Sequence, residues 1–115
     1  MSLNLQRKID GADIRDAISE LSGFSSAELA DPQLRWNRKI ASWRALGLYI
    51  GRERGLSYKD VANFFGVHGM TAYHSYKKVT YELATDETVS NLIKKIEYKI
   101  DNKHENDDRE IQDSP

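Results

Sequence analysis

The stretch Leu56–Ser75, LSYKDVANFFGVHGMTAYHS, has the pattern of two short helices joined by a tight turn. Ala62 supplies the small residue that one helix needs where the next helix crosses it, and Gly66, four residues later, supplies the turn, because glycine adopts a positive φ at low cost. Four apolar residues are spaced to face inward and fix the crossing of the two helices: Val61, Phe65, Val67 and Ala72. We therefore predict a helix-turn-helix over this stretch.

The outward positions of the second helix indicate what the motif does. They are His68, Gly69, Met70, Thr71, Tyr73, His74 and Lys77. All but Gly69 offer hydrogen bonds, bulk or charge to a groove, and a helix-turn-helix inserts its second helix into the major groove of DNA. The leading interpretation is a double-stranded DNA-binding protein with contacts at His68, Gly69, Met70, Thr71 and His74. Met70 packing against the protein, and His74 packing against the preceding helix, are the structural alternatives.

Charge is distributed unevenly along the chain. Residues 1–34 carry three Lys or Arg against six Asp or Glu, residues 35–78 carry nine against two, and residues 79–115 carry five against ten. The central block, with a net charge of +7, coincides with the motif and the segment before it, as expected for a surface that neutralises phosphates. An ordinary solvated face is the alternative. The candidate DNA contacts in this block are Arg35, Arg38, Lys39, Arg44, Lys59, Lys77 and Lys78.

Apolar residues at spacings of three and four predict further helices around the motif. We expect them over about 12–21, 34–54 and 86–102, with a short helix capped by Ser25 and Glu28 after the first. The helix over 34–54 is the expected spine of the domain. Gly47, Gly51 and Gly55 lie along one side of it, which predicts the close approach of a neighbouring helix and a helix end at Gly55.

Length and composition limit the class of protein. We expect a flexible N-terminus over 1–11, one helical DNA-binding domain over 12–103 and a disordered acidic tail over 104–115. The chain has no cysteine, which excludes disulfides and thiolate metal sites, and no apolar run approaches about 18 residues. We therefore expect a cytoplasmic protein that does not associate with membranes.

From about Ile14 to Ile100, the sequence resembles the C-terminal DNA-binding domain of the bacterial chromosomal replication initiator DnaA. Two segments carry most of the resemblance, RALGLYIGRE at Arg44–Glu53 and TAYHSYKKV at Thr71–Val79. The resemblance implies an all-α, tryptophan-repressor-like bundle of about five to six helices that binds duplex DNA. It also implies that Arg44 enters the minor groove beside the second helix of the motif. A surface ion pair is the alternative role for Arg44.

The chain departs from this family at the residues that read bases. Where the family has Gly-Gly-Arg-Asp-His-Thr-Thr, this chain has the shorter Gly66-Val67-His68-Gly69-Met70-Thr71. The family's base-reading Asp, His and first Thr are thus replaced by His68, Gly69 and Met70, and of the base-reading residues only Thr71 is kept. Because phosphate contacts position a protein and base contacts specify the sequence, we expect docking as in the family on a different DNA site. The chain also has no Gly-x-x-x-x-Gly-Lys loop, so the family's ATPase is missing.

Other function classes receive less support from the sequence. The loss of the base-reading residues favours a protein-interaction or regulatory module with replication or regulatory proteins as partners, and fold analogy allows a transcriptional repressor, in which case a homodimer is expected. No metal site is expected, since His68 and His74 are six residues apart rather than the four that place two ligands on one helical face. No enzyme activity is expected, because no spacing of Ser, His and Asp marks a nucleophile elbow, and no cofactor is expected. Trp36 and Trp43 could stack on single strands, but we expect them in or beside the core.

Overall fold

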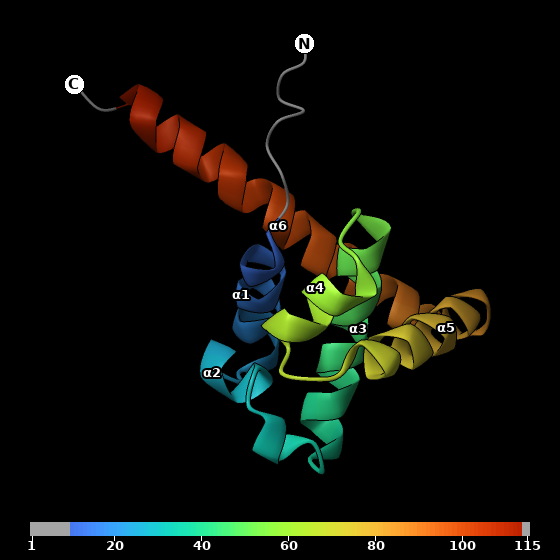
Figure 1. Cartoon of the computed structure of the whole chain (residues 1–115). Coiled ribbons are helices and arrows are strands. Elements are labelled where there is room, and N and C mark those ends of the chain that lie inside the picture. The colour runs from blue at the N-terminus through green and yellow to red at the C-terminus, as the bar shows by residue number, and fades with distance from the viewer. Residues whose placement is uncertain (1–9, 114–115) are drawn as a thin grey trace.

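The computed structural model describes residues 10–113 and the side chains of residues 10–102. Over this range the chain forms six α-helices and a short 3₁₀ helix, without a strand (Figure 1). The elements are α1 (Gly11–Ser22), α2 (Ser26–Leu29), η2 (Pro32–Leu34), α3 (Arg38–Glu53), α4 (Tyr58–Phe64), α5 (Gly69–Thr85) and α6 (Glu87–Asp113). The expectation of an all-α bundle of five to six helices is confirmed.

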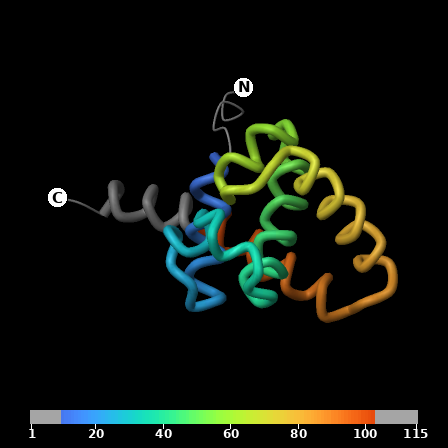
Figure 2. The backbone as a smooth tube through the Cα atoms, turned by 60° about the horizontal axis from the view of Figure 1, so that its bottom comes forward, coloured from blue at the N-terminus to red at the C-terminus, as the bar shows by residue number. Residues whose placement is uncertain are grey.

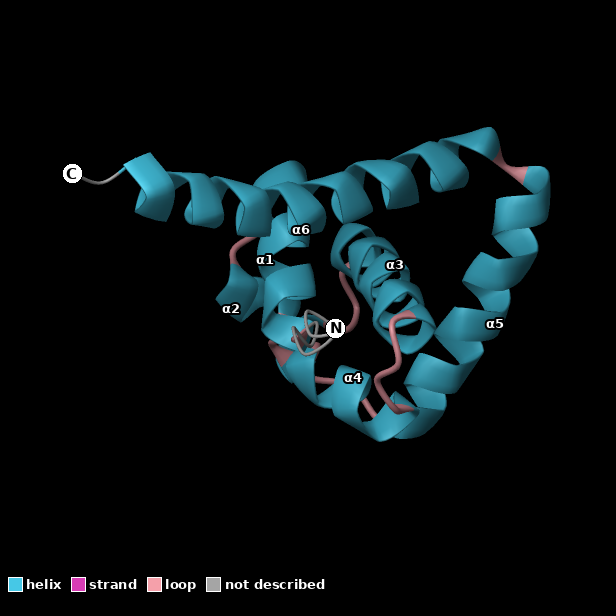
Figure 3. Cartoon of the chain, turned by 90° about the horizontal axis from the view of Figure 1, so that it is seen from above, coloured by secondary structure: helices cyan, strands magenta, loops and turns pink. Residues whose placement is uncertain are grey.

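Helix α3 is the spine of the bundle, as expected. It packs against α1, α2, α4, α5 and α6, and Figure 3 shows α4 and α6 on opposite sides of it. Apolar side chains from all of these helices form a single core around α3; the largest fully buried ones are Ile14, Ile18, Leu29, Ile40, Leu48, Ile50, Val61, Phe65, Val79, Ile96 and Ile100. Helix α5 lies at the edge of the bundle, so one of its faces is left to solvent (Figure 2).

The glycines of α3 allow the neighbouring helices to approach closely. A Cβ added at Gly47 would overlap the ring of Phe65, and one added at Gly51 would overlap the side chain of Val61. Gly55, with a φ of 104°, follows the end of the helix. The close approach and the helix end predicted from these three glycines are therefore both confirmed.

Helix α3 begins later than predicted. Pro32 starts the separate 3₁₀ helix η2, and the side chain of Asn37 caps α3 by accepting a hydrogen bond of 3.1 Å from the backbone N–H of Ile40. Trp36 consequently lies in the loop before α3, where it is 81% exposed. The prediction of a core position was wrong for Trp36, whereas Trp43 is half-buried against the core.

Helix α6 is longer than predicted. It continues from the expected end near Asn102 to Asp113, so the prediction of disorder over 104–115 is not supported for residues 104–113. The segment 87–113 contains neither glycine nor proline, and its first turns are anchored by buried Ile93, Ile96 and Ile100. Residues 1–9 and 114–115 lie outside the described residues, and Gly11, placed in the flexible N-terminus, is the first residue of α1.

Candidate nucleic-acid interface

Helices α4 and α5 form the predicted helix-turn-helix, with residues 65–68 between them. The hydroxyl of Ser57 caps α4 by accepting a 3.0 Å hydrogen bond from the N–H of Asp60. In the turn, Gly66 has a φ of 64°, and the N–H of Val67 donates to the carbonyl of Ala62 at 3.1 Å. The inward residues predicted from the spacing are buried, except Val67, which is partly buried.

The turn packs on a distant part of the chain. A Cβ added at Gly66 would overlap the carbonyl oxygen of Ala30, and would lie 3.4 Å from Cδ of Pro32. Glycine is therefore required at this position for two independent reasons, its positive φ and the approach of the segment between α2 and η2. This segment supports the turn that orients α5.

Arg44 holds the same segment in place from inside the fold. Its side chain is 3% exposed; Nε donates to the carbonyl of Leu29 at 2.7 Å, and Nη2 donates to the carbonyls of Glu28, at 3.2 Å, and Asp31. Burial lowers the pKa of Arg44, and the charge of Asp31 opposes this change. The predicted minor-groove contact of Arg44 is thus wrong, as is the surface ion pair, because the side chain is buried and donates to backbone carbonyls. Two of these carbonyls, those of Glu28 and Asp31, also accept hydrogen bonds from backbone N–H groups.

Four tyrosines attach α5 to α3 and α4. Tyr76 of α5 stacks on Tyr49 of α3 with 5.3 Å between ring centroids. Tyr58 of α4 meets Tyr73 and Tyr76 edge-on, at 5.5 and 6.0 Å. The hydroxyl of Tyr76 also donates a hydrogen bond to the carboxylate of Glu53. These contacts fix the orientation of α5 on the bundle.

The electrostatics of this cluster follow from its contacts. The hydrogen bond to Glu53 raises the pKa of Tyr76, and burial raises the pKa of Tyr49, with further contributions from nearby carboxylates. The sequence pattern placed Tyr73 among the outward residues of the second helix, and the contacts of the cluster were not predicted. The available signal was the spacing of Tyr73 and Tyr76, which places both rings on one side of a helix next to buried Ala72.

The solvent-exposed side of α5 brings together five of the twelve predicted DNA contacts. We call it the α5 face; its exposed residues are Met70, Thr71, His74, Lys77, Lys78 and Tyr81. His68 is exposed at the N-cap, where its side chain makes no capping hydrogen bond. Lys59 of α4 is exposed beside the start of α5, and α5 has no acidic residue before Glu82. Tyr81, 71% exposed, was not predicted, although its spacing from His74 places it on the same face.

The remaining predicted cations lie elsewhere. Arg35, Arg38 and Lys39 are exposed around the amino-terminal end of α3, which lies below α5 in Figure 1. The Arg35 guanidinium lies 5.3 Å from the ring centroid of Trp36. Six of the nine cations in the basic block therefore form two exposed groups, one on and beside α5 and the other before and at the start of α3. Arg52 and Arg54 lie at the opposite end of α3, where Arg54 forms an ion pair with Asp101.

Gly69 differs from the other glycines of the chain. The other six either have a positive φ or lie so close to a neighbour that a Cβ would overlap it. Gly69 has neither feature, because among the described residues a Cβ added there would meet only Cα of Lys59, at the ordinary contact distance of 3.9 Å. The protein's own packing thus does not require glycine at the start of α5.

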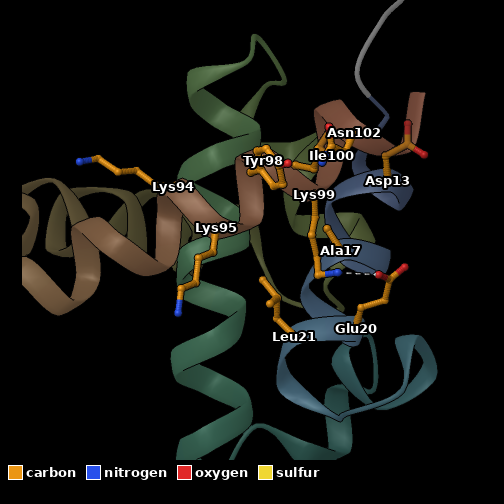
Figure 4. Close-up of a pocket in the computed structure, with 10 residues that line it drawn as sticks. All are labelled: Asp13, Ala17, Glu20, Leu21, Lys94, Lys95, Tyr98, Lys99, Ile100 and Asn102. Carbon is orange, nitrogen blue, oxygen red and sulfur yellow. Dashed lines mark hydrogen bonds and ion pairs between the residues drawn. The ribbon is translucent and has the colours of Figure 1, made fainter. Parts of the chain in front are cut away.

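A groove of about 740 Å³ lies between α1 and α6 (Figure 4). Ala17 and Leu21 of α1 and Ile100 of α6 supply apolar surface, and an ion pair of 3.1 Å joins Lys99 to Glu20. Tyr98, 68% exposed, borders the groove. None of the predicted DNA contacts lines it.

Comparisons with protein-family models, curated proteins and solved structures give no significant match. The assignment of the site therefore depends on its own geometry. Among the described residues, no group of three or more His, Cys, Asp or Glu side chains could hold a metal ion. In the same part of the chain, no helix is both long enough and apolar enough to span a membrane.

Proposed function

We propose that this protein binds double-stranded DNA by inserting the α5 face into the major groove. The observation that carries the proposal is the α5 face itself. It presents two lysines, a histidine and a threonine to solvent, on a helix that follows a tight turn and has no acidic residue before Glu82. Helices presented in this way are the reading elements of helix-turn-helix proteins.

The surrounding cations supply contacts to phosphates. Lys59 lies beside the start of α5. With α5 in the major groove, the phosphate backbone of one DNA strand would pass next to Lys59. Arg35, Arg38 and Lys39 extend the positive surface to the end of α3. Each phosphate contact adds affinity that weakens with salt, so binding should depend steeply on ionic strength.

Gly69 gives independent support. The fold does not require glycine at position 69, yet this position, where α5 would enter the major groove, has no side chain. Close approach of a ligand backbone is a common reason for glycine at such a position. DNA at the start of α5 would meet this requirement.

The test is a titration of a labelled mixed-sequence duplex, followed by fluorescence anisotropy at several salt concentrations. Replacing Lys77 and Lys78 together by alanine should weaken binding and reduce the slope of log affinity against log salt by about 2. The matched control replaces Lys94 and Lys95 of α6, which removes the same charge away from α5. Equal effects of the two double variants would contradict the proposed face, and absence of binding at low salt would reject DNA binding.

The resemblance to the DnaA C-terminal domain supports a DnaA-like arrangement of the helices and a role in DNA replication. The burial of Arg44 removes one of the contacts that this resemblance implies. A protein-interaction module is the second candidate function, favoured by the exposed ring of Trp36 and by the groove between α1 and α6. Tryptophan and arginine are enriched at the energetic centres of protein interfaces.

A further inference from the structure

The amino-terminal part of α5 carries an unusual set of side chains for a helix that reads DNA. Between His68 and His74 the chain has no Arg, Lys, Asn, Gln, Asp or Glu. These are the side chains that form bidentate hydrogen bonds with guanine or adenine, or accept a hydrogen bond from cytosine. Recognition by this part of α5 must therefore use another kind of contact.

The structure narrows the choice of contact residues. Ala72 is buried, and Tyr73, 39% exposed, packs edge-on against Tyr58 and lies with its ring centroid 5.7 Å from Nζ of Lys77. Met70 is 65% exposed and Thr71 is exposed next to it. If α5 enters the major groove of DNA, these two neighbouring side chains are the exposed ones that would meet the base edges first.

The chemistry of these two side chains matches one feature of the major groove. Thymine presents a C5-methyl group there, and this methyl is the apolar group by which base edges can be distinguished. Met70 ends in a thioether and a methyl group, and Thr71 carries a methyl group beside its hydroxyl. The Thr71 hydroxyl can bond to any base, so its hydrogen bond adds little selection.

We propose that Met70 and Thr71 read thymine methyl groups, so that the protein selects sites with thymines beneath the amino-terminal end of α5. This inference rests on the proposed DNA binding and specifies the class of site. Burying an exposed methionine against a methyl group removes apolar surface of both partners from water, which supplies the preference.

The experiment compares two duplexes of A·T pairs that are identical except that one contains uracil in place of every thymine. Uracil keeps the hydrogen-bonding groups of thymine and lacks only the methyl. The wild-type protein should bind the thymine duplex more tightly, by roughly fourfold for each methyl group contacted. Anisotropy titrations of both duplexes, together with the mixed-sequence duplex, measure the ratio.

Two variants identify the origin of the ratio. Met70→Gln keeps the length of the side chain and replaces its apolar end, so the preference for thymine should fall towards that of Thr71 alone. Lys78→Ala should weaken binding to both duplexes and leave their ratio unchanged, because a phosphate contact does not distinguish bases. Circular dichroism melting should show unchanged folding for both variants, since both side chains are exposed.

The outcomes separate this inference from the proposed function. Equal binding of the wild-type protein to the two duplexes would overturn methyl reading and leave DNA binding intact. A ratio as large in Met70→Gln as in the wild-type protein would show that Met70 does not read the methyl groups and would also overturn the inference. Failure to bind any of the three duplexes at low salt would overturn the proposed function together with it.

Discussion

The backbone at Gly66 lies against the carbonyl oxygen of Ala30, so closely that a Cβ on residue 66 would overlap it. The turn of the helix-turn-helix is thus packed on the segment between α2 and η2, which lies before α3 in the chain. Arg44 holds this segment by hydrogen bonds to the carbonyls of Glu28, Leu29 and Asp31. Arg44 therefore supports the orientation of α5 indirectly: it holds the segment on which the turn before α5 packs, and none of these hydrogen bonds reaches α5 itself.

Gly66→Ala should destabilise the protein by roughly 2–4 kcal/mol, because it combines a left-handed backbone conformation with overlap onto Ala30. Gly55→Ala is the matched control, since Gly55 also has a positive φ but has no atom within 4 Å of an added Cβ. It should cost only the conformational strain, about 1–2 kcal/mol. Urea unfolding measures both, and equal losses would show that the contact with Ala30 is unimportant.

Arg44→Ala should lower the free energy of unfolding by about 3 kcal/mol, because it removes a buried side chain together with its hydrogen bonds to three backbone carbonyls. Arg38→Ala, at an exposed position on the same helix, should change it by less than about 0.5 kcal/mol. If Arg44 instead acted at the DNA surface, its removal would weaken binding without affecting the urea midpoint.

Tyr76→Phe should lower the thermal midpoint at pH 8, and this difference should shrink as the pH rises above about 10. The pKa of Tyr76 is raised in the folded state by its hydrogen bond to Glu53, so the stabilisation is fully present below the ordinary tyrosine pKa and is lost as the pH rises through the raised one. Thermal melts of both proteins from pH 8 to 11 check this. A constant difference would mean that the hydrogen bond contributes no pH dependence.

Gly69→Ala should leave stability unchanged or raise it slightly, since alanine favours a helix and the added Cβ has room. DNA binding should nevertheless weaken, by about tenfold if the methyl group costs about 1.4 kcal/mol on contact with the duplex. Paired urea and anisotropy measurements separate the two effects. Unchanged affinity would show that DNA does not approach the start of α5 closely.

Local signals in the sequence were sufficient for much of the fold and of the candidate site. Gly66 forms the turn after α4 as predicted, because left-handed turns are decided by residues close in the chain. Gly47 and Gly51 predicted the packing around α3, since few other reasons exist for glycine inside a helix. The exposed positions of α5 followed from helical periodicity.

The errors arose where distant or competing contacts decide the outcome. Arg44 belongs to a basic block and was taken as a surface residue, but its partners are carbonyls at the end of α2, which no side-chain pattern reveals. Trp36 was placed in the core because the helix was assumed to start near residue 34. Asn37 caps α3, so the helix begins at Arg38 and the ring of Trp36 lies in the preceding loop, exposed to solvent.

The dependence of Gly66 on Ala30 limits how far this protein can be dissected. A graft of residues 56–85 into another scaffold would transfer both helices of the motif and every residue of the α5 face, but not the carbonyl surface beneath its turn. We therefore expect that helices α4 and α5 would not keep their relative orientation when transferred to another protein. During synthesis, too, the segment at residues 28–31 leaves the ribosome first, so the support for the turn precedes the element that it positions.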